Sequence, residues 1–164
     1  MKLHRFAIPT LAFMLAATAV AEPSDANAAF QAIKSLQGTW SGKAMGRDLK
    51  VSFRVTSGGS AVMSEIQSEA DMVTMFHLDG DRVMMTHYCD SGNQPRMVGA
   101  ASPDGKTITF NFIDGTNILS AQMGHMQRLT LTILDPNHHT EKWEFLDKDG
   151  KTEQHEVFDL HRQQ

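Results

Sequence analysis

The chain has 164 residues, 41% of them hydrophobic, and a formal net charge of −4 at pH 7. This length suits one domain with a buried core, and a mildly acidic chain without a basic run lacks the charge pattern of nucleic-acid binding. It also has no basic amphipathic segment of the kind that lies on anionic lipid. Nucleic acid and a membrane surface are therefore excluded as expected partners.

Residues 1–21 have the three parts of a secretory signal peptide. Lys2 and Arg5 form a basic start, Phe6 to Val20 carry no charge, and Ala19-Val20-Ala21 has the small-x-small pattern of a cleavage site. The apolar stretch is shorter than the roughly 20 residues of a membrane-spanning helix. We predict cleavage after Ala21 and a periplasmic or secreted product without a stable membrane anchor; a retained anchor helix is the alternative.

Residues 22–37 form the predicted N-terminal segment. Apolar residues recur in it at intervals of three or four, at Ala28, Ala29, Ala32, Ile33 and Leu36. This spacing predicts a short amphipathic helix with Asp25 as its N-cap, ended by Gly38.

Residues 38–164 have the pattern of an all-β domain. Turn signals such as Asp79-Gly80-Asp81 and Asp147-Lys148-Asp149-Gly150 separate short segments with strand chemistry. We predict ten strands, near residues 39–45, 48–56, 60–68, 71–78, 82–89, 96–102, 106–113, 125–134, 140–147 and 151–161. No long helix is available for a parallel crossover, so the strands should form one antiparallel meander. Closing this sheet into a barrel removes both edges, and a β-sandwich is the alternative.

Three structural residues resemble those of the lipocalin and fatty-acid-binding-protein barrels, the calycins. Gly38 and Trp40 match the Gly-x-Trp that opens the first strand in that group, and Arg162 matches its late arginine. The resemblance implies a lipocalin-like barrel in which Arg162 lies over the indole of Trp40, a cation–π contact. The usual lipocalin disulfide is missing, because Cys89 is the only cysteine.

A second resemblance concerns the densest polar cluster of the chain. The runs Thr86-His87-Tyr88-Cys89 and Asn93-Gln94-Pro95-Arg96-Met97 resemble a family of uncharacterised exported bacterial proteins. That resemblance implies a family but no activity.

The hairpin around Asp79-Gly80-Asp81 predicts which side chains share a face. If these three residues form the turn, Leu78 is opposite Arg82 and Val73 is opposite His87. His77, Met85, His87 and Cys89 then share one face, and we predict that this face lines the barrel interior. Free cysteines are usually buried, so Cys89 is expected to be a packed thiol.

The predicted function is binding of a small apolar or amphipathic molecule in the barrel cavity. The candidate ligand-binding residues are His87, Tyr88, Arg96, Asn111, Met85, Phe110 and His77. Arg96 has a second interpretation, binding to loop carbonyls. For a protein partner, the open alternative is a second copy of the chain in a homodimer.

Other classes of function stay open. The eleven methionines and eight histidines, with soft ligands in Met123-Gly124-His125-Met126, keep copper binding or haem binding as alternatives. A structural or interaction module with a filled barrel is a third class. No hydrolase pattern is present, so an enzyme is disfavoured, and we assign no catalytic residue, metal ligand or cofactor.

Overall fold

The computed structural model describes residues 25–67, 71–120 and 123–164. The predicted signal peptide and the side chain of the predicted N-cap Asp25 lie outside the described residues. The elements are α1 (Asp25–Ser35), β1 (Gly38–Ala44), β2 (Arg47–Thr56), the 3-10 turn η1 (Ser57–Gly59), β3 (Ala61–Gln67), β4 (Met72–Asp79), β5 (Arg82–Tyr88), β6 (Gln94–Ala101), β7 (Thr107–Thr116), β8 (His125–Asp135), β9 (His138–Leu146) and β10 (Thr152–Arg162).

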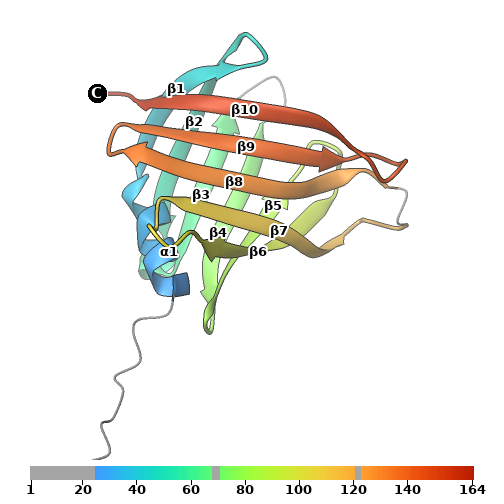
Figure 1. Ribbon diagram of the computed structural model, residues 1–164, viewed down its shortest axis with the longest axis horizontal. Helices are drawn as coiled ribbons and strands as arrows, with labels where there is room; N and C mark the ends of the chain where they lie inside the picture. The colour runs from blue at the N-terminus through green and yellow to red at the C-terminus, as the bar shows by residue number, and fades with distance from the viewer. Residues whose placement is uncertain (1–24, 68–70, 121–122) are drawn as a thin grey trace, which may run out of the picture.

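The ten strands form one closed antiparallel barrel (Figure 1). Each strand pairs with the next along the chain, and β1 pairs with β10, where Trp40 is opposite Arg162. This confirms the predicted all-β meander barrel with a short N-terminal helix and excludes the sandwich. Over the described ranges, no helix has the length and apolar character that crossing a membrane requires.

Gly42 permits the close approach of β1 and β10 at this closure. A Cβ atom at residue 42 would lie 1.8 Å from the backbone oxygen of Asp159. Only a residue without a side chain fits there, which explains why a glycine occupies the middle of this strand.

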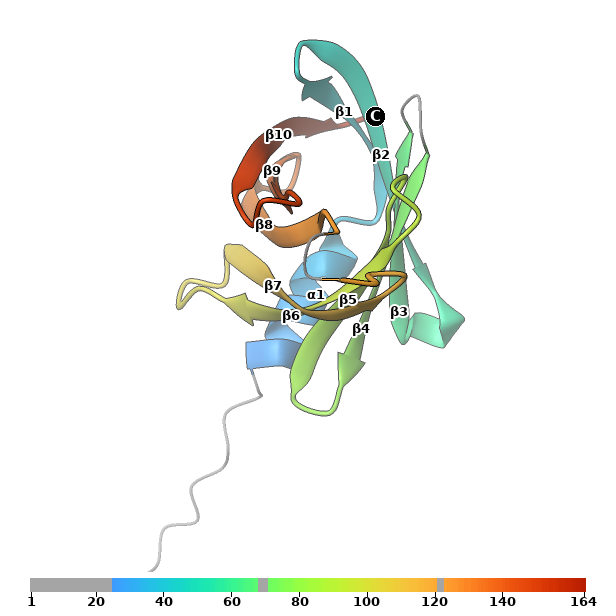
Figure 2. The ribbon, with the colours of Figure 1, turned by 90° about the vertical axis from the view of Figure 1, so that its right-hand side faces the viewer.

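The helix α1 closes one end of the barrel, and Figure 2 shows it behind the opening at the other end. Its apolar residues Phe30 and Ile33, and Leu36 directly after it, are buried in the core. The indole nitrogen of Trp40 donates a 2.7 Å hydrogen bond to the carbonyl of Leu36. The buried side chain of Trp40 thus connects the end of α1 to β1 and to the barrel core.

The predicted contact between Arg162 and Trp40 is present. The guanidinium carbon of Arg162 lies 4.2 Å from the centre of the Trp40 ring. Its nitrogens donate to the carbonyls of Ser35, Gln37 and Pro136 at 3.0, 2.7 and 2.9 Å. Arg162 therefore holds the end of α1 and the β8–β9 turn against the closing strand pair.

The predicted register of β4 and β5 is wrong by one residue. The turn contains only Gly80 and Asp81, so Asp79 is opposite Arg82 and Thr74 is opposite His87. Gly80 has φ 61°, as a tight two-residue turn requires. Because side chains alternate between faces, this shift moves His77 from the face of His87 to the other face.

Side chains fill the half of the barrel nearer α1. Aromatic contacts cross its interior: the ring of Phe53 lies 6.5 Å from Phe76, and Phe76 lies 5.5 Å from Phe110. Met85, Met97 and Phe110 are fully buried in the same core. One pocket, of about 380 Å³, lies beside α1 and is lined by Leu36, Ile133 and Arg162 among others. Another lies at the end of the barrel away from α1, here called the open end.

Candidate functional site

Three of the predicted site residues point into the barrel. His87, Met85 and Phe110 are each 0% exposed. Met85 and Phe110 belong to the packed core, whereas His87 is closer to the open end, two residues further along β5 than Met85. Met85 and Phe110 are therefore core residues, and His87 is a polar residue that lies nearer to the open end.

Four predicted site residues do not line the barrel interior, and for His77, whose face was predicted to be the interior one, the expectation is wrong. Tyr88 is 49% exposed, because it follows the inward-pointing His87 on an alternating strand. Asn111 lies on the outer face, where its side-chain oxygen Oδ1 accepts a 2.9 Å hydrogen bond from Nε of Arg128. His77 faces outward with it, since the turn before β5 is one residue shorter than predicted.

Arg96 is the fourth, and it is held on the outer face by Asp114. Its Nε and one terminal nitrogen each donate to a carboxylate oxygen of Asp114 at 2.5 Å. This fork-to-fork pair raises the pKa of Arg96 above its usual value. Arg96 thus binds neither loop carbonyls nor a ligand in the lumen; it ties β6 to β7.

His87 is the polar centre of the open end. Its Nδ1 lies 2.9 Å from the hydroxyl of Thr74, and its ring packs on Trp143 with centroids 4.8 Å apart. Burial lowers the pKa of His87 from 6.5 to about 4, although the nearby charge of Asp90 opposes the shift. The imidazole is therefore neutral at pH 7, and its Nε2 has no hydrogen-bond partner within the described part of the chain.

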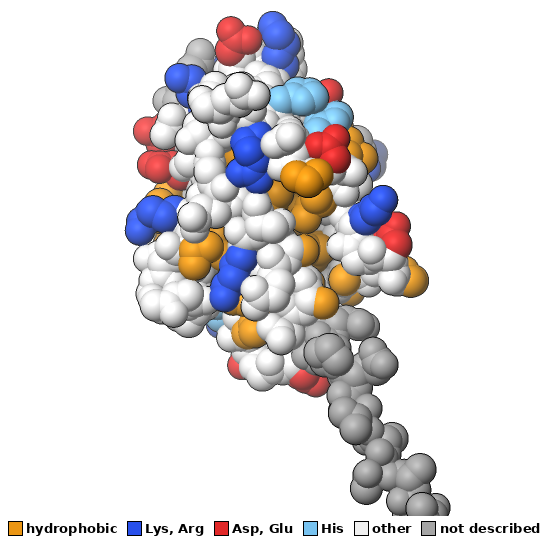
Figure 3. Space-filling view, turned by 90° about the vertical axis from the view of Figure 1, so that its left-hand side faces the viewer, with side chains coloured by type: hydrophobic (Ala, Val, Ile, Leu, Met, Phe, Trp, Pro, Cys, Tyr) orange, Lys and Arg blue, Asp and Glu red, His pale blue; other side chains and the backbone are white. Residues whose placement is uncertain are grey.

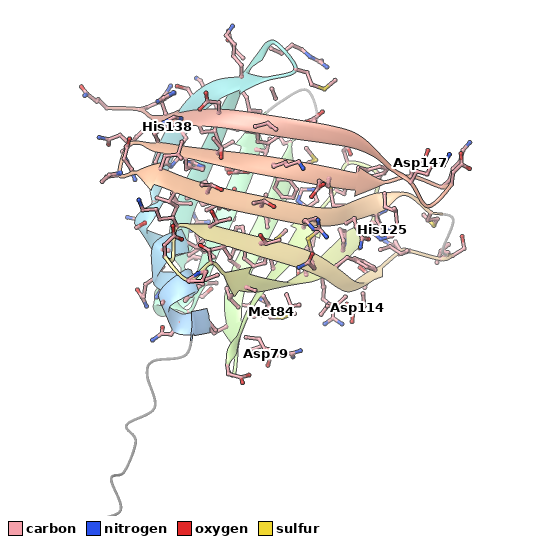
Figure 4. The ribbon with its side chains drawn as sticks, viewed as in Figure 1. Asp79, Met84, Asp114, His125, His138 and Asp147 are labelled. Atoms are coloured by element: carbon pink, nitrogen blue, oxygen red, sulfur yellow. The ribbon has the colours of Figure 1, made fainter. Side chains whose placement is uncertain are left out.

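Two further buried side chains at this end have an unpaired polar atom. The amide nitrogen of Asn93 donates to the carbonyl of Gly124 at 2.9 Å, which leaves its Oδ1 without a partner among residues 25–67, 71–120 and 123–164. His125 donates from Nδ1 to the carbonyl of Met123 at 3.0 Å, and its buried Nε2 likewise has no hydrogen-bond partner among these residues. Figure 4 shows His125 at the end of the barrel opposite His138.

Cys89 is a packed thiol, as predicted. It is 8% exposed, and its sulfur accepts a hydrogen bond from the Ser91 hydroxyl at 3.0 Å. Burial raises the pKa of the thiol. A thiol held in the protonated form is a poor nucleophile.

A buried carboxylate lies deeper in the barrel, and the sequence analysis missed it. Glu141 is 1% exposed; one carboxylate oxygen accepts from Trp143 Nε1 at 3.0 Å, and the other lies 3.3 Å from His139 Nε2. The turn before β9 consists of Pro136 and Asn137, so β9 begins at His138 and His139 is buried. The alternation His139, Glu141, Trp143 on one strand face was the available signal.

Replacing Trp143 by Phe should lower the free energy of unfolding by about 1–3 kcal/mol, because it leaves a buried carboxylate oxygen without its donor. Urea unfolding measures this cost. In a Glu141→Leu background the same Trp143→Phe change should cost much less, since no carboxylate remains to be satisfied. Equal costs in both backgrounds would assign the effect to packing alone.

A pocket of about 440 Å³ opens at the open end. Its residues come from five strands and two turns: Ala44, Met45, Arg47, Asp48, Leu49, Ile66, Met72, Asp90, Glu156 and Phe158. The side chains of Leu49, Ile66 and Phe158 are buried and form an apolar floor. Charged residues stand at the rim, most of them acidic.

The fold and this site define a closed ten-stranded barrel with a packed core at the helix end and a pocket at the other. Solved structures share this fold. The crystal structure of Rv2717c from M. tuberculosis matches with a TM-score of 0.62 and 19% identity, over 83% of this chain and 98% of that chain. At this identity the likeness shows the fold alone.

A second solved structure is a protein of unknown function from the DUF3598 family of Nostoc punctiforme PCC 73102. It matches with a TM-score of 0.56 and 11% identity, over 80% of this chain and 49% of that chain. The chain thus spans about half the length of that protein. No protein-family model matches the sequence, and no curated protein matches it.

Proposed function

We propose that this protein binds a small, mostly apolar molecule with a polar end in the pocket at the open end of the barrel. The volume of about 440 Å³ is within the usual range of about 300–1,000 Å³ for ligand pockets. The apolar floor of Leu49, Ile66 and Phe158 supports an apolar body for the ligand. The sequence-predicted export to the periplasm or outside the cell belongs to the same proposal.

The observation that carries the proposal is the pocket itself, with the buried His87 behind its wall: His87 is not a lining residue, and its Nε2 has no partner among the described residues. Glu156, in the pocket wall, is opposite Trp143, and Trp143 packs on the His87 ring. Asp90, also in the wall, is the charge that acts on His87. A buried polar group without a partner costs about 1–3 kcal/mol, which a ligand group reaching Nε2 would recover.

The pocket rim supports a neutral or cationic polar end. Asp90 and Glu156 carry negative charge at the wall, and Asp48 is paired with Lys43 at 3.3 Å. A carboxylate-bearing ligand, such as a free fatty acid, would meet more like charge than opposite charge there, because Arg47 is the one cation among the lining residues. The rim therefore argues for an alcohol, amide or amine group on an apolar body.

The Ala44→Phe variant tests this pocket. Ala44 is half-buried in the pocket wall, so a phenyl ring there should fill the space and lower the affinity for the neutral apolar dye Nile red at least 10-fold. Lys43→Phe adds the same ring to the outer face of the same strand and should leave the affinity unchanged. Fluorescence titration gives both values.

Native mass spectrometry of the protein expressed with its own leader identifies the natural ligand. An organic adduct of a few hundred daltons, present in Lys43→Phe and lost in Ala44→Phe, supports the proposal. An adduct with the mass of haem or of a copper ion would contradict the proposal and support the metal- or haem-binding alternative. A bare chain that also fails to bind Nile red saturably would indicate a filled barrel that acts as an interaction module.

A further inference from the structure

Three potential metal ligands gather on the outer face of the barrel, at the end closed by α1. They are His138 at the start of β9 and Asp159 and His161 near the end of β10. His138 Nε2 lies 2.5 Å from Asp159 Oδ1, and His161 Nε2 lies 3.8 Å from the same oxygen. Figure 3, which faces this end, shows histidine side chains gathered beside an acidic one.

The strand register holds these side chains together. His161 is directly opposite His138 in the β9–β10 pair, and Asp159 is two residues earlier on β10, so all three point to the same side of the sheet. The imidazole rings stack with centroids 4.2 Å apart. Since β10 is paired on both sides and ends at the anchored Arg162, the backbone under the cluster is rigid.

We propose that His138, Asp159 and His161 bind a zinc ion. Two imidazoles and one carboxylate form a known type of zinc ligand set, and bonds of about 2.0–2.2 Å in tetrahedral geometry put the ligand atoms about 3.3–3.6 Å apart. The three ligand atoms here all lie within 4.8 Å of one another. Side-chain rotations must bring the most distant pair of ligand atoms roughly 1 Å closer and move His138 Nε2 and Asp159 Oδ1, now 2.5 Å apart, roughly 1 Å further from each other for one ion to reach all three.

Solvent and charge around the cluster are compatible with an ion. The side chains of Asp159 and His161 are each 62% exposed, and that of His138 is 28% exposed, so the ion has an entry path. The nearest cation by strand register is Lys43, opposite Asp159, and its ammonium group pairs with Asp48 at 3.3 Å. Three protein ligands leave one zinc position open for water or for a group on a partner molecule.

The site is independent of the proposed ligand pocket, because it is on the outer face and at the opposite end of the barrel. Zinc binding and Nile red binding should therefore not influence each other, and failure of one proposal leaves the other intact.

Isothermal titration of the tag-free chain with zinc chloride tests the inference. The expected result is one zinc ion per chain, with affinity reduced at least 30-fold in His161→Asn and in Asp159→Asn. His77→Asn, which removes an outward-facing histidine elsewhere on the barrel, should leave the titration unchanged.

Cobalt(II) gives a second readout, because its visible absorption reports the ligand set. A cobalt spectrum that shows nitrogen ligands in the parent chain and changes in His138→Asn supports the site. Equal zinc affinity in the parent and the His161→Asn chain, or no saturable binding below 1 mM zinc in a correctly folded parent chain, would overturn it.

Discussion

Trp40→Ala should lower the free energy of unfolding by about 3–5 kcal/mol, the usual cost of deleting a fully buried large aromatic side chain. Trp40 is 0% exposed, so its removal leaves a cavity between α1 and the closing strands. It also removes the 2.7 Å hydrogen bond to Leu36 and the surface on which Arg162 stacks. Urea unfolding followed by circular dichroism measures the loss.

Two control variants separate the contributions at Trp40. Trp40→Phe keeps an aromatic ring but loses the indole donor, so it should cost clearly less than Trp40→Ala. Val157→Ala truncates an exposed side chain of β10 and should change stability by less than about 0.5 kcal/mol. A Trp40→Ala cost below 1 kcal/mol would show that the closure does not depend on this side chain.

Acid should destabilise the barrel through His87. The folded-state pKa of about 4 is below the unfolded value of 6.5, so the unfolded chain binds more protons between these two pH values. Stability is therefore fully present above about pH 6.5 and falls as the pH drops towards 4. The linkage relation gives a loss from this residue of about 2 kcal/mol between pH 7 and pH 5, and about 3 kcal/mol at pH 4.

The His87→Gln variant isolates this contribution, because glutamine does not titrate. Urea unfolding at several pH values between 7 and 4 should show a weaker decrease for His87→Gln than for the parent chain, by about 2 kcal/mol at pH 5. His77→Gln, outside the core, should keep the parent pH dependence. Parallel pH profiles for the parent and His87→Gln would contradict a buried neutral His87.

The strand count and the element borders were predictable because the signals are local. Turn chemistry such as Asp147-Lys148-Asp149-Gly150 marks the strand ends within one or two residues, whichever strands then pair, except that β7 continues to Thr116, three residues beyond its predicted end. The short helix was predictable for the same reason, from apolar spacing over residues 25–35.

The candidate site was predictable only in part, because side-chain direction depends on a register of single-residue precision. One residue fewer in the Gly80-Asp81 turn moved His77 to the outer face. Arg96 resembled a lumen cation by residue type, but its direction depends on its place in β6 and on Asp114, 18 positions away. His139 lies outside the strand predicted near residues 140–147, whereas β9 begins two residues earlier, at His138.

By itself, the sequence determined a ten-strand antiparallel meander with a helix before it. These elements follow from turn residues and alternation, which act over a few positions, whereas the contact of Arg162 with Trp40 was implied by the resemblance to the calycin barrels. Only the tertiary structure decided that side chains fill the helix-end half of the barrel, that the pocket is at the open end, and that His138, Asp159 and His161 meet. Those features depend on how distant strands align when the barrel closes, and alignment across a closed sheet is a property of all ten strands together.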